Sequence, residues 1–358
     1  MTKTTQKNRG KLILPLIVLG VGWGSIIWWL WASSPPGAGM PQKVRVVIAD
    51  GMSSAGIAQQ LEAAGVIRSG LALRLFLQWQ ALQQGGRIPL RAGTYELATD
   101  LPLPEVVKEL QSDRARLQVM RVTIPEGWNL RDMAQLFEAK GLFSAQAFLQ
   151  IANRPPAGRR AWLPADSPNL EGFLFPDTYE VIVGVTTPEE VVEMMLDRFE
   201  AVALPVYFEY RQRVTAPAVQ LSLKEWVALA SIVEKETVLE RERRLIAGVF
   251  WHRLQKNMRL ESDPTVEYGL GIRQTKEQPL TLAQVRTPHP YNTYLNAGIP
   301  PGAIAAPGLA SLKAVLNPEP TEYLFFVARY DGSHAFSRTH GEHLKQVELI
   351  ARKIREKQ

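Results

Sequence analysis

The chain of 358 residues carries 41 lysine and arginine residues against 35 aspartate and glutamate residues, a formal net charge of +6. Its length predicts about two or three domains, and its 46% of hydrophobic and 21% of charged residues exclude a mostly disordered chain. Because the chain contains no cysteine, a disulfide scaffold, a cysteine-ligated metal site and a thiol nucleophile are excluded as well.

The first predicted element is an uncharged apolar run at residues 12–32. A helix of this length spans about 30 Å, the thickness of the hydrocarbon core of a bilayer. Four basic residues precede the run, a Pro/Gly/Ser segment without charge follows it, and tryptophans cluster at its far end. This pattern predicts a single-pass membrane anchor with residues 1–11 in the cytoplasm and the rest of the chain outside. A cleaved signal peptide, whose apolar core is typically shorter, and a buried soluble helix are the alternatives.

Most of the net positive charge lies in the N-terminal region that contains the predicted anchor. Residues 1–40 contain four basic and no acidic residues, so residues 41–358 carry only about two of the six excess positive charges. No run of lysine and arginine with interleaved aromatic residues remains outside the anchor region. The sequence therefore predicts no nucleic-acid partner.

A repeat follows the linker at residues 33–43. Residues 44–67 and 120–143 align at a constant offset of 76, with a glycine near the middle and another near the end of each copy. Each copy is predicted to form a short strand, a turn at Asp-Gly or Glu-Gly, and an amphipathic helix that stops at glycine. This unit resembles the LysM-like module that binds polysaccharide in cell walls. A duplication for structure alone is the alternative, and contact with sugar stays open.

The remaining elements are predicted from periodicity and from Pro and Gly breaks. In chain order they are helix 71–84, a turn into a strand at 91–97, helix 101–112, a Pro/Arg-rich loop at 153–168, helix 187–202, helix 222–237, helix 239–256, a loop at 258–271, an irregular Pro/Gly-rich stretch at 287–308, a buried strand at 321–328 with its partner at 334–337, and helix 340–356. The charged start of the helix at 239–256, residues 240–244, is expected to be a solvated surface.

The helix at 222–237 contains the strongest catalytic candidate. Its start has the capping-box spacing of Ser222 and Glu225, and its body is apolar on nearly every side. A helical wheel places Glu236 within about 60° of Leu229, Ile232 and Val233, whereas Glu234 lies about 160° away on a smaller, more polar face. Burial among aliphatic side chains raises the pKa of a carboxyl group, as a general acid requires. A solvated helix end is the alternative interpretation.

Polar residues suited to a sugar follow this helix. Asp263 and Thr265 flank a proline in a predicted turn, and the stretch 291–294 (Tyr-Asn-Thr-Tyr) offers stacking faces and neutral hydrogen-bonding groups. An ordinary ordered loop is the alternative. His340 and His343 lie three residues apart, but no third ligand has a recognisable spacing, so the sequence predicts no metal site. Nucleotide-binding glycine motifs and the G-x-S-x-G motif are absent from the sequence.

Several motifs in series resemble one family. They are ASIVEKET (230–237), RLESDPTVEYGLG (259–271), TPHPYNTY (287–294), GIPPGAIAAPG (298–308), SLKAVLNP (311–318), and upstream RAGTYEL (91–97), IPEG (124–127) and EGFLFPDTYEV (171–181). Together with the N-terminal anchor, they make the chain similar to the endolytic murein transglycosylase (MltG/YceG-like) family over about residues 44–350. The loop within 145–170 does not align with a family pattern.

The resemblance implies a peptidoglycan lytic transglycosylase, a lyase that cuts the β-1,4 bond between N-acetylmuramic acid and N-acetylglucosamine inside nascent strands. The product would end in 1,6-anhydro-N-acetylmuramic acid. The second glutamate of EKET, Glu236, would act as general acid and then as general base. Glu234, Asp263, Thr265, Asn292 and Tyr294 are candidates for binding the sugar or orienting Glu236.

The implied setting is the bacterial inner membrane, with the catalytic part outside the cytoplasm, no cofactor, and glycan strands and peptidoglycan synthases (penicillin-binding proteins) as partners. Termination of growing glycan strands would be the role of such an enzyme. The alternatives are a non-catalytic wall-binding scaffold and a hydrolase that pairs Glu236 with Asp263 or Glu234.

The expected fold class is α+β: a single N-terminal transmembrane helix, LysM-like small α/β modules, and a mixed α/β catalytic domain. The expected divisions are tail 1–11, anchor 12–32, linker 33–43, LysM-like module with its connecting segment 44–118, and catalytic domain 119–358, which begins with the second repeat copy.

Overall fold

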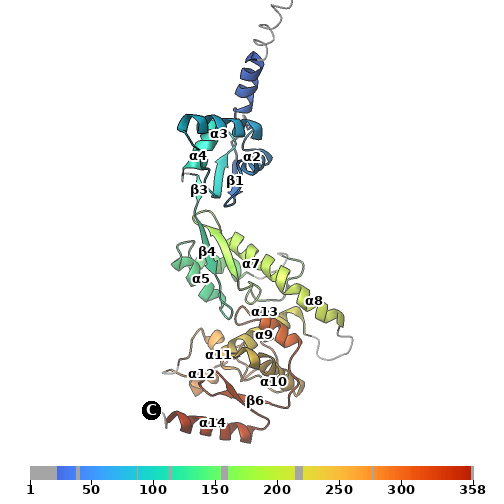
Figure 1. The fold of residues 1–358 in the computed structure, drawn as a ribbon. Helices are drawn as coiled ribbons and strands as arrows, with labels where there is room; N and C mark the ends of the chain where they lie inside the picture. Colours follow the sequence, from blue (N-terminus) through green and yellow to red (C-terminus); the bar gives the residue numbers. More distant parts are fainter. Residues whose placement is uncertain are drawn as a thin grey trace, which may run out of the picture. The chain divides into compact units, whose positions relative to one another are not determined.

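The computed structural model describes residues 22–37, 41–86, 88–112, 115–154, 160–213, 221–275 and 278–355. The chain divides into two compact units, one ending at Val119 and one beginning at Met120 (Figure 1). Each unit combines helices with a small sheet, and the expected α+β class is therefore confirmed.

The expected anchor lies only partly within the described residues. The tail 1–11 and residues 12–21 lie outside them, whereas residues 22–32 are helical. In the described part of the chain, no helix is both long enough and apolar enough to cross a membrane. Large apolar side chains on the described turns are exposed, namely Trp23, Ile26, Ile27, Leu30 and Trp31.

The first unit is built on a three-stranded antiparallel sheet. In spatial order the strands are β1 (Lys43–Ile48), β2 (Gly93–Ala98) and β3 (Arg116–Leu117), and the helices are α2 (Ser54–Ala63), α3 (Gly70–Gln84) and α4 (Leu103–Gln111). Val46 pairs with Tyr95, and both side chains are almost completely buried in the core that the three helices share. The predicted helices at 71–84 and 101–112 and the strand at 91–97 are confirmed within a few residues.

The two repeat copies adopt the same local structure. In each copy a strand leads through a glycine with positive φ into a helix, and the strand and helix of the second copy are β4 (Val119–Thr123) and α5 (Leu130–Ala139). The φ angles of Gly51 and Gly127 are 75° and 77°, and those of Gly65 and Gly141 are 68° and 70°. Side chains with a Cβ atom are disfavoured in this left-handed region, which explains why glycine occupies these positions in both copies. The likeness to LysM modules stays a prediction.

The second unit begins with the pair of strands β4 and β5 (Thr178–Ile182). Its first helices after α5 are α6 (Ala145–Ala152), α7 (Pro188–Val202) and α8 (Leu204–Arg213). Helix α7 confirms the prediction for 187–202, whereas α6 and α8 were not predicted. Residues 155–159 of the expected Pro/Arg-rich loop lie outside the described residues, and its other residues form no helix or strand.

Three further helices of this unit pack around two buried tryptophans. They are α9 (Leu223–Glu236), α10 (Arg243–Gln255) and α13 (Leu309–Leu316), and the short 3₁₀ helix η1 (Glu240–Glu242) precedes α10. Trp226 on α9 donates its indole N–H to the carbonyl of Leu312 at 2.8 Å, and Trp251 on α10 donates to that of Val315 at 2.7 Å. The first indole thus fixes α13 against α9, the helix that ends at Glu236, and the second fixes α13 against α10.

The last elements correct two predictions. Residues 258–271 are not entirely a loop, because α11 (Asp263–Leu270) forms there, with Pro264 in the first turn, where a missing N–H is tolerated. Gly271 ends it with φ 66°. The buried strand predicted at 321–328 is only the partly buried β6 (Phe325–Ala328), which pairs with β7 (His334–Ser337) as expected. Helices α12 (Leu282–Val285) and α14 (His340–Arg355) complete the unit.

We expect the close approach of α10 to the segment after α13 to be sensitive to one methyl group. A Cβ atom at Gly248 would lie 2.1 Å from the carbonyl oxygen of Glu319. Gly248→Ala should therefore lower stability by about 1–3 kcal/mol, as overpacking does. Gly341→Ala in α14, where nothing lies within 4 Å, should be neutral or stabilising. Melting temperatures of both variants test this, and equal values would contradict it.

Candidate active site

Glu236 is the last residue of α9 and is partly buried. One of its oxygens, Oε1, accepts a hydrogen bond of 2.6 Å from the hydroxyl of Ser262. Burial raises the pKa of Glu236 to about 7, while the hydrogen bond from Ser262 works in the opposite direction. The negative charges of Asp263 and Glu267 raise this pKa further, and Lys235 lowers it. The direction of the shift agrees with the expectation from the helical wheel.

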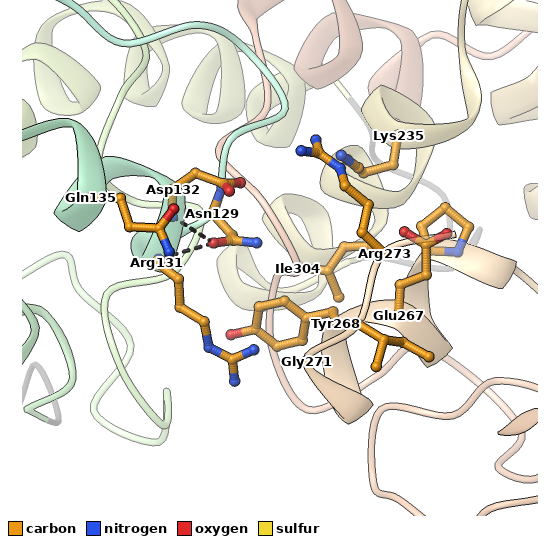
Figure 2. A pocket seen from close by; sticks show the side chains of 12 residues that line it. Asn129, Arg131, Asp132, Gln135, Lys235, Glu267, Tyr268, Gly271, Arg273 and Ile304 are labelled. Atoms are coloured by element: carbon orange, nitrogen blue, oxygen red, sulfur yellow. Dashed lines mark hydrogen bonds between the residues drawn. The ribbon is translucent and has the colours of Figure 1, made fainter. Parts of the chain in front are cut away.

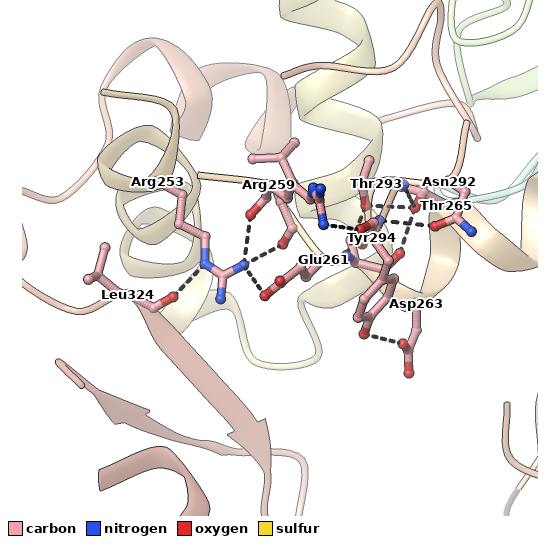
Figure 3. A network of polar contacts seen from close by, with 11 residues as sticks. Arg253, Arg259, Glu261, Asp263, Thr265, Asn292, Thr293, Tyr294 and Leu324 are labelled. Carbon is pink, nitrogen blue, oxygen red and sulfur yellow. Dashed lines mark hydrogen bonds and ion pairs between the residues drawn. The ribbon is translucent and has the colours of Figure 1, made fainter. Parts of the chain in front are cut away.

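Ser262 is held in place by two buried threonines. Its backbone N–H donates to Oγ1 of Thr293 at 3.0 Å, and its carbonyl accepts from Oγ1 of Thr265 at 2.6 Å. The two threonine hydroxyls are 2.8 Å apart and hydrogen-bonded to each other (Figure 3). Both threonines are at most 1% exposed. The hydroxyl that reaches Glu236 is therefore positioned by a closed network from α11 and the 291–294 stretch.

Two of the candidates from the sequence lie in this scaffold rather than at the surface. Thr265 is 0% and Asn292 is 1% exposed. Asn292 donates to the carbonyls of Val285 and Thr287 at 2.8 and 2.9 Å and accepts from the backbone N–H of Tyr294 at 3.0 Å. Direct contact with a ligand would require these bonds to break, so the structure fits an orienting role for both side chains.

Asp263 and Tyr294 lie together and are only partly buried. The phenol of Tyr294 donates to Oδ1 of Asp263 at 2.7 Å (Figure 3). Burial and the adjacent charge of Asp263 raise the pKa of Tyr294 above its usual value, so the phenol stays a hydrogen-bond donor. The structure brings these two candidates together beside Glu236, whose pKa responds to Asp263.

Glu234 has a separate environment, although it is only two residues from Glu236. Its carboxylate pairs with the guanidinium of Arg243 at 3.1 Å and accepts hydrogen bonds from the Ser311 hydroxyl at 2.6 Å and the Gly308 backbone N–H at 3.1 Å. The side chains of Glu234 and Arg243 are 9% and 11% exposed. The prediction of a solvated surface at 240–244 is therefore wrong for Arg243, because it is the counter-ion of a buried carboxylate.

Sequence reasoning missed Arg253, a buried cation on α10. It donates to the carbonyls of Leu324, Arg259 and Leu260 at 2.6, 2.9 and 3.0 Å, and it pairs with Glu261 at 2.9 Å (Figure 3). These contacts fix the segment that leads into Ser262. An arginine that follows the apolar stretch 245–251 was the only signal that the sequence offered.

An open pocket is lined by Lys235, the residue before Glu236 in the chain, and by Glu267, whose charge acts on Glu236 (Figure 2). It encloses about 710 Å³, including space open to solvent. Its walls come from the first turns of α5, the end of α9 at Lys235, and α11 with the residues after it, including Glu267 and Arg273. Tyr268 of α11 lies between Asn129 and Glu267 in Figure 2. Among the described residues, no cluster of three or more histidines or acidic residues could hold a metal ion.

Glu171, a second residue that sequence reasoning missed, is buried beneath this pocket. Both of its oxygens lie 3.2 Å from the backbone N–H of Leu130, the first residue of α5. Burial raises the pKa of Glu171 to about 8, although the Leu130 N–H and the Tyr268 hydroxyl favour the charged form. Glu171 belongs to the EGFLFPDTYEV motif, but that motif gave no reason to single it out.

We expect Glu171 to make stability depend on pH. Its folded pKa of about 8 exceeds the ordinary value of 4.5, so the folded protein holds this proton more tightly than the unfolded chain does. Stability should therefore fall as the pH rises from about 4.5 to 8. Glu171→Gln should flatten that decline, whereas Glu348→Gln on the exposed face of α14 should not. Melting temperatures across this range test the effect, and parallel curves would contradict it.

The comparisons with known proteins agree with this architecture. Residues 46–349 match the model of the YceG-like family, and the chain therefore belongs to that family. It is 28% identical over 319 residues to the endolytic murein transglycosylase of Bacillus subtilis (strain 168), covering 85% of this chain and 84% of that protein.

Two further proteins are similar. The endolytic murein transglycosylase of Streptococcus pneumoniae serotype 2 (strain D39) is 29% identical over 341 residues, which cover 87% of this chain but only 59% of that protein. The crystal structure of a yceG-like protein from Listeria monocytogenes matches with a TM-score of 0.58 and 30% identity, covering 86% of this chain and 100% of that one.

Proposed function

We propose that this protein is an endolytic peptidoglycan lytic transglycosylase, a lyase in which residues 119–358 form the catalytic domain and Glu236 is the catalytic residue. The observation that carries this proposal is the carboxyl group of Glu236, with a pKa of about 7, on the helix end beside an open pocket. The names of the Bacillus and Streptococcus relatives support the reaction class.

In the first step, protonated Glu236 donates its proton to the glycosidic oxygen between N-acetylmuramic acid and N-acetylglucosamine. The bond between that oxygen and C1 of the muramic acid then breaks, and the N-acetylglucosamine leaves with a 4-hydroxyl group. A pKa of about 7 supports this role, since a large fraction of Glu236 is protonated at neutral pH. The negative charges of Asp263 and Glu267 would favour the positive charge that develops at C1.

In the second step, the Glu236 carboxylate accepts the proton of the C6 hydroxyl while that oxygen forms a bond to C1. The product is a 1,6-anhydro-N-acetylmuramic acid end, and Glu236 is protonated again for the next cycle. The Ser262 hydroxyl would stabilise the carboxylate between the steps through its 2.6 Å hydrogen bond. Because the substrate supplies its own nucleophile, one carboxyl group is sufficient.

A two-carboxylate hydrolase is the first alternative. The contacts of Glu234 with Arg243, Ser311 and Gly308 disfavour it as the second carboxylate, since they hold the side chain in a buried ion pair. Asp263 accepts a hydrogen bond from Tyr294 and is more accessible, so it is the partner that a hydrolase would use. In the lyase, Asp263 and Tyr294 would instead contact the sugar, and Thr265 and Asn292 would orient Ser262 and the adjoining loop.

The second alternative is a non-catalytic wall-binding scaffold. The raised pKa of Glu236 favours the enzyme over this alternative. Burial disfavours the charged form of this carboxyl group, and a group with such a pKa is suited to proton transfer but not needed by a scaffold. For a lyase held at the membrane, cleavage of strands as they emerge would terminate glycan polymerisation, and peptidoglycan synthases (penicillin-binding proteins) would be its partners.

We further propose that residues 12–32 anchor the protein in the plasma membrane, with the N-terminus in the cytoplasm. The exposed apolar side chains of residues 22–32 support this, and so does α3, which carries an exposed apolar stripe at Leu71, Leu75, Trp79 and Leu82. Trp29 stacks on Phe76 of α3, and Phe76 stacks on Trp79, with ring centroids 6.2 and 5.7 Å apart. The stripe is thus continuous with the anchor and suits the membrane interface.

Glu236→Gln should reduce cleavage of purified peptidoglycan by about 10²- to 10⁴-fold, because glutamine can neither donate nor accept the proton. Mass spectrometry of the wild-type products should find anhydro ends, and the variant should keep the wild-type melting temperature. Glu348→Gln, at an exposed position of the same unit, is the matched control and should cleave normally.

Each contrary outcome identifies an alternative. Reducing ends instead of anhydro ends would support the hydrolase, and absence of cleavage by the wild-type protein would support the scaffold. Full activity of the folded Glu236→Gln variant would overturn the assignment of the catalytic residue.

The absence of native cysteines allows a direct test of the anchor and the stripe. Single cysteines at Ile27, Leu75 and Leu82 would carry spin labels in the full chain, reconstituted in lipid nanodiscs, with Gln59 of α2 as the exposed control. We expect oxygen to relax the first three labels more than a water-soluble nickel chelate does, and the reverse at Gln59. Stronger relaxation by the nickel chelate than by oxygen at Ile27 would overturn the proposed anchor. The same result at only Leu75 and Leu82 would overturn the proposal that α3 lies at the membrane interface.

A further inference from the structure

Positively charged residues outnumber negatively charged ones in the lining of the pocket, by three to two. Lys235, Arg131 and Arg273 all line it (Figure 2). Lys235 directly precedes Glu236 in α9, so the pocket begins one residue from the proposed proton donor. The two arginines come from opposite walls, Arg131 from α5 and Arg273 from the segment after α11.

The acidic groups at this pocket already have partners. Asp132 accepts the backbone N–H of Asn129 at 3.2 Å in the capping box of α5. Glu267 accepts hydrogen bonds from the backbone and side chain of Gln274. Glu171, buried beneath the pocket, is bound to the N-terminus of α5. These bonds occupy the carboxylates, and none of them forms an ion pair with Arg131 or Arg273 among the described residues, although the charge of Arg131 lowers the pKa of Glu171.

The three cationic side chains of the pocket differ in their hydrogen-bond partners. Lys235 donates to the carbonyl of Gly127 at 3.3 Å. Within the part of the chain that the structure describes, the side chains of Arg131 and Arg273 form no hydrogen bond or ion pair, and both are exposed. The guanidinium of Arg131 lies against the backbone of Gly271, since a Cβ atom there would be 2.8 Å from Nη1. Arg131 therefore reaches from α5 to the end of α11, across the pocket.

We propose that Arg131 and Arg273 bind a carboxylate of the peptide that murein carries on the lactyl group of N-acetylmuramic acid. This inference rests on the proposed function. The sugar that is attacked at C1 carries its lactyl group on C3 of the same ring, so its peptide leaves the site within one ring of Glu236. A guanidinium matches a carboxylate through two parallel hydrogen bonds, and glycan without peptide offers no such anion.

The pocket thus selects strands that still carry their peptides. Binding energy from the peptide would position the muramic acid over Glu236 without taking part in the bond cleavage. The two arginines are specificity-determining residues in this scheme, and their loss affects the binding of substrate more than the chemical step.

The test compares two substrates made from one preparation: uncrosslinked glycan strands with their peptides, and the same strands after an amidase has removed the peptides. Wild type, Arg131→Gln, Arg273→Gln and the double variant are assayed as full chains. Lys140→Gln, an exposed cation at the C-terminal end of α5 outside the pocket, is the matched control.

We expect the wild-type protein to have a lower KM for peptide-bearing strands than for bare strands. The double variant should raise the KM for peptide-bearing strands about tenfold or more, as loss of hydrogen bonds to a charged group does, with little change in kcat. The KM for bare strands should not change, and Lys140→Gln should behave as wild type. Unchanged melting temperatures exclude a loss of fold at these exposed positions.

Equal KM values of the wild type for both substrates would overturn this inference while leaving the proposed lyase intact. Equal losses of the double variant on both substrates would also overturn it, because the arginines would then act on the glycan itself. Cleavage of neither substrate by the wild type would overturn the proposed function, and the inference with it.

Discussion

The hydrogen bond from Ser262 to Glu236 joins the end of α9 to the start of α11, and the site depends on it. Burial alone would favour the protonated form of the Glu236 carboxyl group, but it would not fix the orientation of that group. The serine partly offsets that effect and fixes one oxygen, so the pKa settles at about 7 rather than higher. The threonine network behind Ser262 and the Arg253 contacts before it are the means by which the fold holds this single bond in place.

Helix α9 gives two glutamates, two residues apart, opposite environments. The helical turn directs Glu234 toward α10 and α13, where Arg243 neutralises its charge and the Ser311 hydroxyl donates a hydrogen bond to it. It directs Glu236 toward α11, where the nearby charges are mostly negative. Removing one partner of a buried ion pair lowers stability far more than removing one partner of an exposed pair, so the environment of Glu234 serves the fold. The environment of Glu236 keeps a proton available near neutral pH, as the proposed acid–base role of this residue requires.

Charge is also distributed unevenly around the pocket. Asp263 and Glu267 act on Glu236, whereas the side chains of Arg131 and Arg273, which line the pocket, form no hydrogen bond or ion pair among the described residues. In the proposed reaction, the negative groups would favour the positive charge that develops at C1, and the two arginines would bind a peptide carboxylate. Glu171 links α5 to α11 at this pocket, since it accepts a hydrogen bond from the backbone N–H of Leu130 and interacts with Tyr268.

The sequence by itself determined the α+β class, the repeated strand–turn–helix unit, the capped helix at 222–237 and the apolar side of Glu236, because these follow from local periodicity and backbone preference. Tertiary structure alone decided which polar residues are buried. Thr265 and Asn292 became scaffold, Arg243 left the surface to pair with Glu234, and residues 263–270 became a helix. Ser262, Thr293, Arg253 and Glu171 each have a partner 26 to 71 residues away in the chain, and no local pattern encodes such distant contacts.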